Sequence, residues 1–202
     1  MAQPIIIFQS GHYTYQQSEP TDLLIYVLCL TSADIQIEVE QLVPNAKVDI
    51  RALAYISNKD CARIHTHVRH LASNGTSRQT VKFVLNGEAT GEFFGDLNIA
   101  HGVQLIDAQQ TNRNILLSDN AQMRTRPQLI IYADDVKASH GATTGQLDEN
   151  ALFYMQQRGI GIETAKQMLL KAFVQDVLPL SMDGVVEHVQ QRLLELGLTE
   201  DI

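Results

Sequence analysis

Three features that define particular classes of protein are scarce in this sequence. Cysteine occurs only at Cys29 and Cys61, so we expect no disulfide framework and predict a reduced, cytoplasmic setting. Lys and Arg form no clusters and the net charge is -8, which argues against nonspecific binding to nucleic acid. The longest apolar run, Leu23 to Leu30, is far too short to span a bilayer, and no signal peptide is visible after Met1, so we expect no membrane association.

The composition is otherwise that of an ordinary globular protein. The chain has 202 residues, of which 45% are hydrophobic and 19% charged, enough for one domain with a real core and a helical appendage. It contains no GxGxxG, HExxH, GxSxG or paired CxxC motif and no phosphate-binding GxxxxGK motif, so we expect no enzyme. Gly87, Gly91 and Gly95 recur every four residues, which among alternating residues is typical of turns and bulges.

From about Ile5 to Ile131 the sequence alternates between apolar and polar residues, as strands with one buried face do. Ile35, Ile37 and Val39 fall on one such face. The same pattern recurs at Val48, Ile50, Ala52, Ala54 and Ile56 and at Val81, Phe83 and Leu85. Turn residues separate the runs at Pro44-Asn45, Ser57-Asn58-Lys59, Ser73-Asn74-Gly75 and Asn86-Gly87.

Many short strands with no helix between them indicate either a β-sandwich or a β-solenoid. A set of small and asparagine positions late in the run, which we expect to point inward, favours the solenoid, because its coils stack equivalent side chains. These positions are Asn98, Ala100, Asn112, Asn114 and Ser118. The spacing alone does not decide between the two folds.

After Leu147 the apolar period changes to about 3.6 residues and predicts three helices. The first has Asp148 as its N-cap and ends at Gly159. The second ends at Pro179, with an apolar stripe made of Ala165, Met168, Leu169, Ala172, Phe173 and Val177. The third has Ser181 as its N-cap, Gly197 as its stop, and an inner face made of Val186, Val189 and Leu193. We therefore divide the chain into a β core, residues 1–146, and a helical subdomain, residues 147–202.

Two histidine-containing segments are candidates for chemistry. In CARIHTHVRH, a strand places Cys61, His65 and His67 on one face, a donor set that suits zinc or iron. Arg63 and Arg69 share that face and disfavour a cation, so a solvated outer face is the preferred interpretation. The opposite face, suited to the core, consists of Ala62, Ile64, Thr66 and Val68.

The second candidate is His140, which lies between the last strand and the first helix. Asp134 and Asp135 could support a metal-bound or general-base imidazole, or could simply form a turn. Ser139 beside His140 is no hydrolase signal, since neighbours in a strand point to opposite faces. The residues alone leave a structural and a functional role for His140 open.

A specific set of residues lies between about Leu105 and Leu178. The set consists of Gln110, Asn112, Asn114, Leu116-Leu117-Ser118, Thr125, Pro127, Asp135-Val136, His140-Gly141-Ala142-Thr143, Gly145, Leu147-Asp148, Leu152-Phe153-Tyr154 and Arg158-Gly159-Ile160. These residues resemble the SufB/SufD family of the SUF iron-sulfur cluster assembly system. The HGAT form of the motif around His140 indicates a resemblance to the SufD subunit rather than to SufB.

This resemblance implies a mainly β fold, a right-handed parallel β-helix (solenoid) followed by a small C-terminal helical subdomain. It implies a noncatalytic scaffold that pairs with a SufB-like subunit through β-helix edges, docks a SufC-like ATPase through its helices, and forms a homodimer when isolated. His140 corresponds to a family histidine and is a possible metal ligand of a nascent, transient iron-sulfur cluster. The helical residues expected to contact partners are Phe153, Tyr154, Arg158 and Phe173.

The chain departs from the family in two respects. Ala138 stands where the family usually has a cysteine, so no thiolate is expected beside His140. We expect a short form that lacks the family's N-terminal helical domain, and Gly11 to Pro20 is a candidate cap for the first coil. The alternative hypothesis is a stand-alone metal-binding or hydrolytic β-solenoid that uses His65, His67 or His140.

Overall fold

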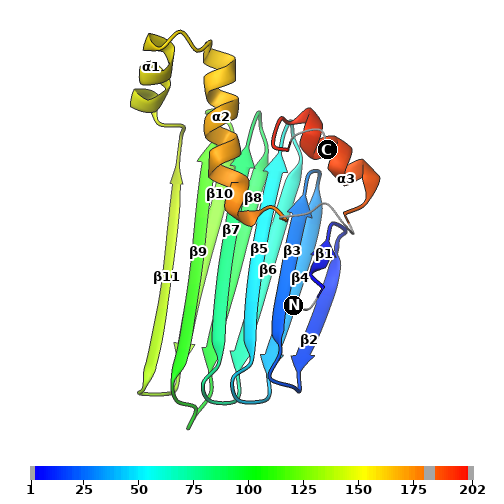
Figure 1. Ribbon diagram of the computed structural model, residues 1–202, viewed down its shortest axis with the longest axis vertical. Coiled ribbons are helices and arrows are strands. Elements are labelled where there is room, and N and C mark those ends of the chain that lie inside the picture. Colours follow the sequence, from blue (N-terminus) through cyan, green and yellow to red (C-terminus); the bar gives the residue numbers. More distant parts are fainter. Residues whose placement is uncertain (1–2, 180–184, 200–202) are drawn as a thin grey trace.

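The computed structural model describes residues 3–179 and 185–199 (Figure 1). Eleven strands precede the helices. The strands are β1 (Ile5–Ile7), β2 (Gly11–Gln17), β3 (Asp22–Cys29), β4 (Ala33–Gln41), β5 (Lys47–Ile56), β6 (Cys61–His70), β7 (Thr76–Leu85), β8 (Thr90–Ile99), β9 (Ile106–Leu116), β10 (Gln122–Ile131) and β11 (Val136–Gly145). The helices are α1 (Glu149–Gln157), α2 (Ile162–Val174), the 3-10 turn η1 (Gln175–Val177) and α3 (Glu187–Glu195).

Consecutive strands from β2 onward alternate between two parallel sheets. One sheet has the order β1-β3-β5-β7-β9-β11 and the other the order β10-β8-β6-β4-β2. Every paired strand runs parallel to its neighbour, which sits one coil away in sequence. The chain is therefore a solenoid and not a sandwich, and the mainly β fold with C-terminal helices is confirmed (Figure 1).

The predicted alternation is confirmed inside the coils. Ile35, Ile37 and Val39 are buried in the lumen, and so are the inward residues predicted in β5 and β7. Asn112 and Asn114 also point inward, as expected. The expectation for Asn98 is wrong: it alternates with the buried Leu97 and Ile99 and so lies on the outer face of β8.

The turns between strands follow the predicted chemistry. Asn45, Asn58 and Asn74 all have positive φ, between 61° and 65°, and Gly87 has φ 70°. Asparagine and glycine tolerate this left-handed backbone better than other residues. Leu105 adopts the same conformation, with φ 57°, and its side chain is 58% exposed. A branched apolar residue there is strained by roughly 1–2 kcal/mol.

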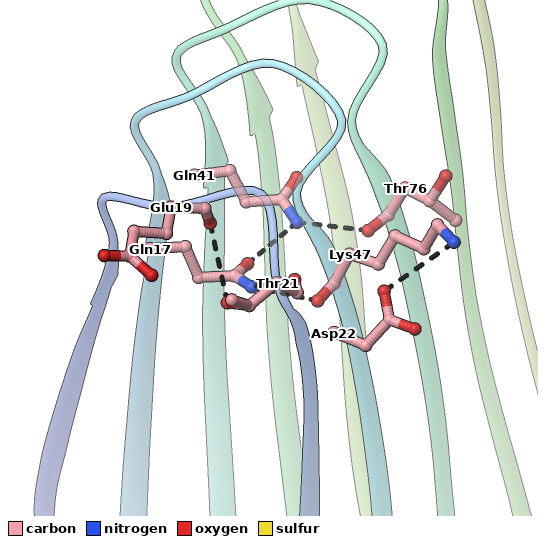
Figure 2. Close-up of polar contacts among 7 residues, drawn as sticks. All are labelled: Gln17, Glu19, Thr21, Asp22, Gln41, Lys47 and Thr76. Atoms are coloured by element: carbon pink, nitrogen blue, oxygen red, sulfur yellow. Dashed lines mark hydrogen bonds and ion pairs between the residues drawn. The ribbon is translucent and has the colours of Figure 1, made fainter. Parts of the chain in front are cut away.

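Glutamines tie together the corner where the strands of the two sheets meet (Figure 2). Gln17 Nε2 donates to the carbonyl oxygens of Thr21 and Lys47 over 2.9 and 3.0 Å. Gln41 Nε2 donates to Gln17 Oε1 over 3.0 Å and to the carbonyl oxygen of Thr76 over 3.1 Å. These amides hydrogen-bond carbonyl oxygens just before β3 and at the first residues of β5 and β7.

His70 continues this glutamine column in the next coil, where it is paired in register with Gln41. It is fully buried, with Nε2 lying 2.9 Å from Ser77 Oγ. Burial lowers the pKa of His70 to about 4, because the charged ring would lose its hydration. Gly75 leaves room for the ring, since a Cβ there would lie 2.8 Å from His70 Nδ1. The ring is thus a neutral core residue.

The interpretation of Gly11 to Pro20 as a cap is wrong. Residues Gly11–Gln17 form β2, which pairs in register with β4 and is itself the edge strand of its sheet. The alternation explains this, because Tyr13 and Tyr15 are half-buried and pack on the lumen core while the residues between them are exposed. The segment extends the solenoid rather than covering it.

The first helix begins and ends where the sequence predicts. Asp148 Oδ1 accepts from the backbone N–H groups of Asn150 and Ala151, over 2.8 and 3.2 Å. Gly159 has φ 83°, the conformation expected just after a helix end. Gly197 plays the same part after α3 with φ 66°. Ser181, the predicted N-cap of the last helix, lies outside the described residues, and Val186 occupies the N-cap of α3.

The predicted stripe of α2 is partly wrong. Ala165 and Val177 are buried as expected, but Met168 is 50% exposed and Ala172 is exposed. The buried face also contains Leu170 and Val174, which pack on outward apolar residues of β3, β5, β7 and β9. These outward residues are Leu28, Leu53, Val84 and Ile115. α3 contributes Val189 and Leu193 to the same cluster, as predicted.

Candidate functional site

The solenoid ends at β10 and β11, and this end carries His140. Each of these strands is the last of its sheet, and no strand of the described residues pairs with its outer edge. In Figure 1, β11 stands at the left edge of the sheet, below α1. Backbone N–H and C=O groups along such an edge can pair with another chain. The site therefore combines an exposed strand edge with a histidine.

His140 projects toward the lumen side of β11. It is paired in register with Gln110, whose side chain is buried in the lumen. The next rungs confirm the direction, because Thr144 Oγ1 accepts from the lumen side chain of Asn114 over 3.1 Å. Residues two apart on a strand share a face, so His140 lies on the lumen face with Thr144. Its side chain remains exposed because no described coil follows.

The structure does not bring the other predicted ligands to His140. Asp134 and Asp135 lie in the turn before β11, six and five residues before His140 along an extended chain. Ala138 is half-buried on the same lumen face as His140. Among residues 3–179 and 185–199, no three His, Cys, Asp or Glu side chains gather as a metal site.

Neither cysteine offers a thiolate to His140. Cys29 is the last residue of β3 and is buried in the lumen, several coils away from β11. Its burial raises the pKa of its thiol to about 12. Cys61 is half-buried at the start of β6, in the opposite sheet to β11. A buried thiol with so high a pKa stays protonated and unreactive near neutral pH.

The segment of β6 between Cys61 and His70 shows the predicted division into two faces. His65 and His67 lie on the outer face of the second sheet, away from His140. His65 Nε2 is 3.9 Å from Glu92 Oε1, and His67 Nδ1 is 3.7 Å from Asp96 Oδ2. Each imidazole thus has its own carboxylate neighbour on the next strand.

These pairs belong to a wider pattern of charge on that face. Asp34, Arg63, Glu92 and Arg124 are paired in register on β4, β6, β8 and β10, so their charges alternate from coil to coil. Arg63 lies 3.7 Å from both Asp34 and Glu92. Exposed pairs of this kind contribute about 0–1 kcal/mol each. The face is an ion-pair ladder, as the preferred interpretation of a solvated strand requires.

Two buried glutamines lie in the column below His140; the resemblance includes Gln110, but the alternation pattern singles out neither of them. Thr66 Oγ1 donates to Gln79 Oε1 over 2.6 Å, and Gln110 Nε2 donates to the same oxygen over 3.2 Å. Gln79 and Gln110 occupy the lumen column that ends at His140. Both glutamines lie in phase with apolar residues of their strands, which indicates that they face inward. The alternation does not indicate that their side chains hydrogen-bond to each other across strands.

The helical end carries an exposed aromatic surface. Phe153 and Tyr154 on α1 are 63% and 60% exposed, and no residue of α1 is buried. Arg158 lies over the Tyr154 ring, 5.0 Å from its centroid, and donates to Tyr154 Oη over 2.7 Å. Phe173 lies apart from them, half-buried beneath Lys82, whose Nζ is 4.7 Å from the ring centroid. α1 thus packs less closely on the chain's core than α2 and α3, each of which has buried residues.

The fold and the site together define a parallel β-solenoid protein with an exposed terminal strand, a histidine at its open end and a helix that presents aromatic residues. No helix within the described residues is long and apolar enough to cross a membrane.

Residues 29–173 match the family model described as "SUF system FeS cluster assembly, SufBD core domain". The chain belongs to this SufBD family of the SUF iron-sulfur cluster assembly system. It is 35% identical to the iron-sulfur cluster assembly protein SufD of Escherichia coli over 150 residues, which are 74% of this chain and 36% of that protein.

Two further relatives show the same partial coverage. Protein ABCI7, chloroplastic, of Arabidopsis thaliana is 34% identical over 143 residues, 70% of this chain and 30% of that protein. SufD of Bacillus subtilis is 35% identical over 107 residues, 52% of this chain and 24% of that protein. The chain thus spans about a third or less of the length of the curated relatives it matches.

Proposed function

We propose that this chain is a noncatalytic, SufD-like scaffold subunit of iron-sulfur cluster assembly. Its membership of the SufBD family is the single observation that carries the proposal. The exposed edge of β11 supports pairing with a SufB-like subunit, and exposed Phe153 and Tyr154 support docking of a SufC-like ATPase. His140 lies at the paired end as a possible ligand of a transient cluster, which is the cargo of the assembly.

The docking surface consists of Phe153, Tyr154 and Arg158. Aromatic and arginine side chains contribute disproportionately to protein interfaces, and truncating such a residue commonly costs about 2 kcal/mol or more. Phe173 stays a prediction as a contact residue: its position under Lys82 suits a support for α2 better than a direct contact.

The first experiment is a pull-down of this chain with SufB and SufC from the same source, under anaerobic conditions, with iron and sulfide measured on the purified complex. We expect a complex that contains SufC. Changing Phe153 and Tyr154 together to Ser should weaken SufC binding about 30-fold or more. Leu42→Ser is the matched control, since Leu42 is 41% exposed but lies on the opposite end of the solenoid. Equal SufC binding by both variants would contradict the docking surface.

The edge of β11 is tested with Gly141→Glu. A Cβ at Gly141 meets nothing within 4 Å in this chain, so the variant should fold normally while placing a charge at the pairing edge. We expect it to abolish pairing with SufB and to convert the isolated protein from homodimer to monomer in light scattering. A monomeric unmodified protein at micromolar concentration would contradict the predicted homodimer.

A further inference from the structure

The hydrogen bonds inside the last coils converge on Gln79. Gln79 Oε1 accepts from both Thr66 Oγ1 and Gln110 Nε2. Because Gln110 uses its amide nitrogen for this bond, its carbonyl oxygen faces elsewhere. That oxygen, Gln110 Oε1, is buried and has no hydrogen-bond partner within the described part of the chain. A buried acceptor without a donor is unusual in native proteins and marks a place where a donor is expected.

The amide of Gln110 lies in space that a glycine of the opposite sheet leaves free. A Cβ on Gly95 of β8 would lie 2.2 Å from Gln110 Nε2 and 2.6 Å from Gln110 Cδ. The absence of a side chain at Gly95 therefore makes the room in which the amide lies, across the lumen from its own strand. Gln110 is only 1% exposed. Its carbonyl oxygen is thus a fixed group rather than a mobile surface one.

His140 is the next residue in the same column. Gln79, Gln110 and His140 are paired in register on β7, β9 and β11. Neighbouring strands lie about 4.8 Å apart, and in-register side chains of parallel strands project in the same direction. Pro127, the register partner of Gly95 on β10, has no side-chain donor to offer. An imidazole N–H at His140 is a donor of the right kind, one strand away from the unpartnered oxygen.

We propose that Gln110 is a positioning residue for His140, accepting a hydrogen bond from one ring N–H. This bond fixes the tautomer and the ring orientation, and it leaves the other ring nitrogen unprotonated with its lone pair at the open end. Only the use of that nitrogen as a cluster ligand rests on the proposed function. The bond itself involves this chain alone: the structure holds the two residues in register without it, so forming it requires a rotation of the His140 side chain.

The test follows the ring nitrogens of His140 by NMR in the uniformly 15N-labelled full chain, without iron or partner, at about pH 8. The signals are assigned by their loss in His140→Gln. We expect one tautomer, with a ring N–H protected from exchange with water. Gln110→Met preserves side-chain length without an acceptor, and we expect it to abolish the protection. A wild-type ring whose N–H exchanges as fast as free imidazole, or whose bonded nitrogen accepts rather than donates, overturns the inference.

Two control variants separate this bond from general loosening of the open end. Asn112→Leu removes another buried lumen amide, whose register partner is Ala142 rather than His140. Thr125→Val removes a side-chain hydroxyl of β10 that, like Gln110 Oε1, is buried in the lumen without a partner in the described residues. Both should keep the protected ring N–H. If Thr125→Val alone abolished the protection, the positioning group would be Thr125 and not Gln110.

The same variants distinguish this inference from the proposed function. In the complex with SufB and SufC, Gln110→Met should lower cluster loading about 10- to 100-fold, as loss of a partner of a ligating histidine commonly does. A protected ring N–H in a chain that forms no complex would support the inference and contradict the proposed function. A loaded complex in which the ring is unprotected would contradict the inference and support the function.

Discussion

His70 gives a quantitative prediction for stability against pH. The ring is fully buried, has no carboxylate partner, and titrates at about 4 in the folded chain. In the unfolded chain a histidine titrates near 6.5, so between these values the unfolded state binds a proton that the folded state does not. Stability is therefore complete above about pH 6.5 and falls as the pH is lowered. The loss should reach about 2 kcal/mol at pH 5 and about 3 kcal/mol below pH 4.

The assay is urea unfolding followed by far-ultraviolet circular dichroism, since the chain has no tryptophan. The comparison is His70→Gln, because Gln41 occupies the equivalent position of the preceding coil. Carboxylates titrate in both proteins, so the difference between their pH profiles isolates the histidine. Between pH 7 and pH 5 the wild type should lose about 2 kcal/mol more than the variant. Parallel profiles would refute the reasoning, as would an NMR titration of the wild-type ring centred near 6.5.

Three further predictions concern single positions. Leu105→Asn should raise the free energy of unfolding by about 1 kcal/mol, because asparagine tolerates positive φ better; an unchanged urea midpoint would contradict the assigned strain. Lys82, only 4% exposed, donates to Asp176 over 2.5 Å, so Lys82→Met should leave α2 and η1 more open to hydrogen exchange, whereas unchanged exchange would show that apolar packing alone holds them. Gly95→Ala should destabilise the chain by about 1–3 kcal/mol through its clash with Gln110, measured by thermal melting, and a neutral result would mean that the amide has another place to go.

Local patterns predicted most of the solenoid correctly. Most strands carry their own alternation, and several turns carry their own asparagine or glycine, so Asn45, Asn58 and Asn74 could be placed without knowledge of the rest of the chain. The choice between sandwich and solenoid was different. It depends on which strands pair, and strands about 30 residues apart in sequence leave no local signal of their pairing.

The errors have a common physical cause, which is packing between distant segments. α2 is apolar on more than one side, and the outward Leu53 and Val84 of the sheet select which side is buried. Leu53 stands between two inward alanines, where a strand pattern does not distinguish an outward apolar residue from part of a continuous buried run. At the site, the link between Thr66, Gln79 and Gln110 joins three strands, so no single stretch of sequence reveals it.

The alternating charges on the outer face of β4, β6, β8 and β10 have a consequence for recognition. The ladder ends in a basic rung at Arg124, next to the open edge of β10. A strand that adds to this edge continues the sequence of signs only if its matching outward residue is acidic, and a basic residue there meets repulsion from Arg124. If the neighbouring chain carries the same alternation of charge, a displacement of that chain by one whole coil places a basic residue opposite Arg124 instead of an acidic one. The ladder thus contributes little to stability, but it sets the sign of charge that a neighbouring strand must carry opposite Arg124 to avoid repulsion.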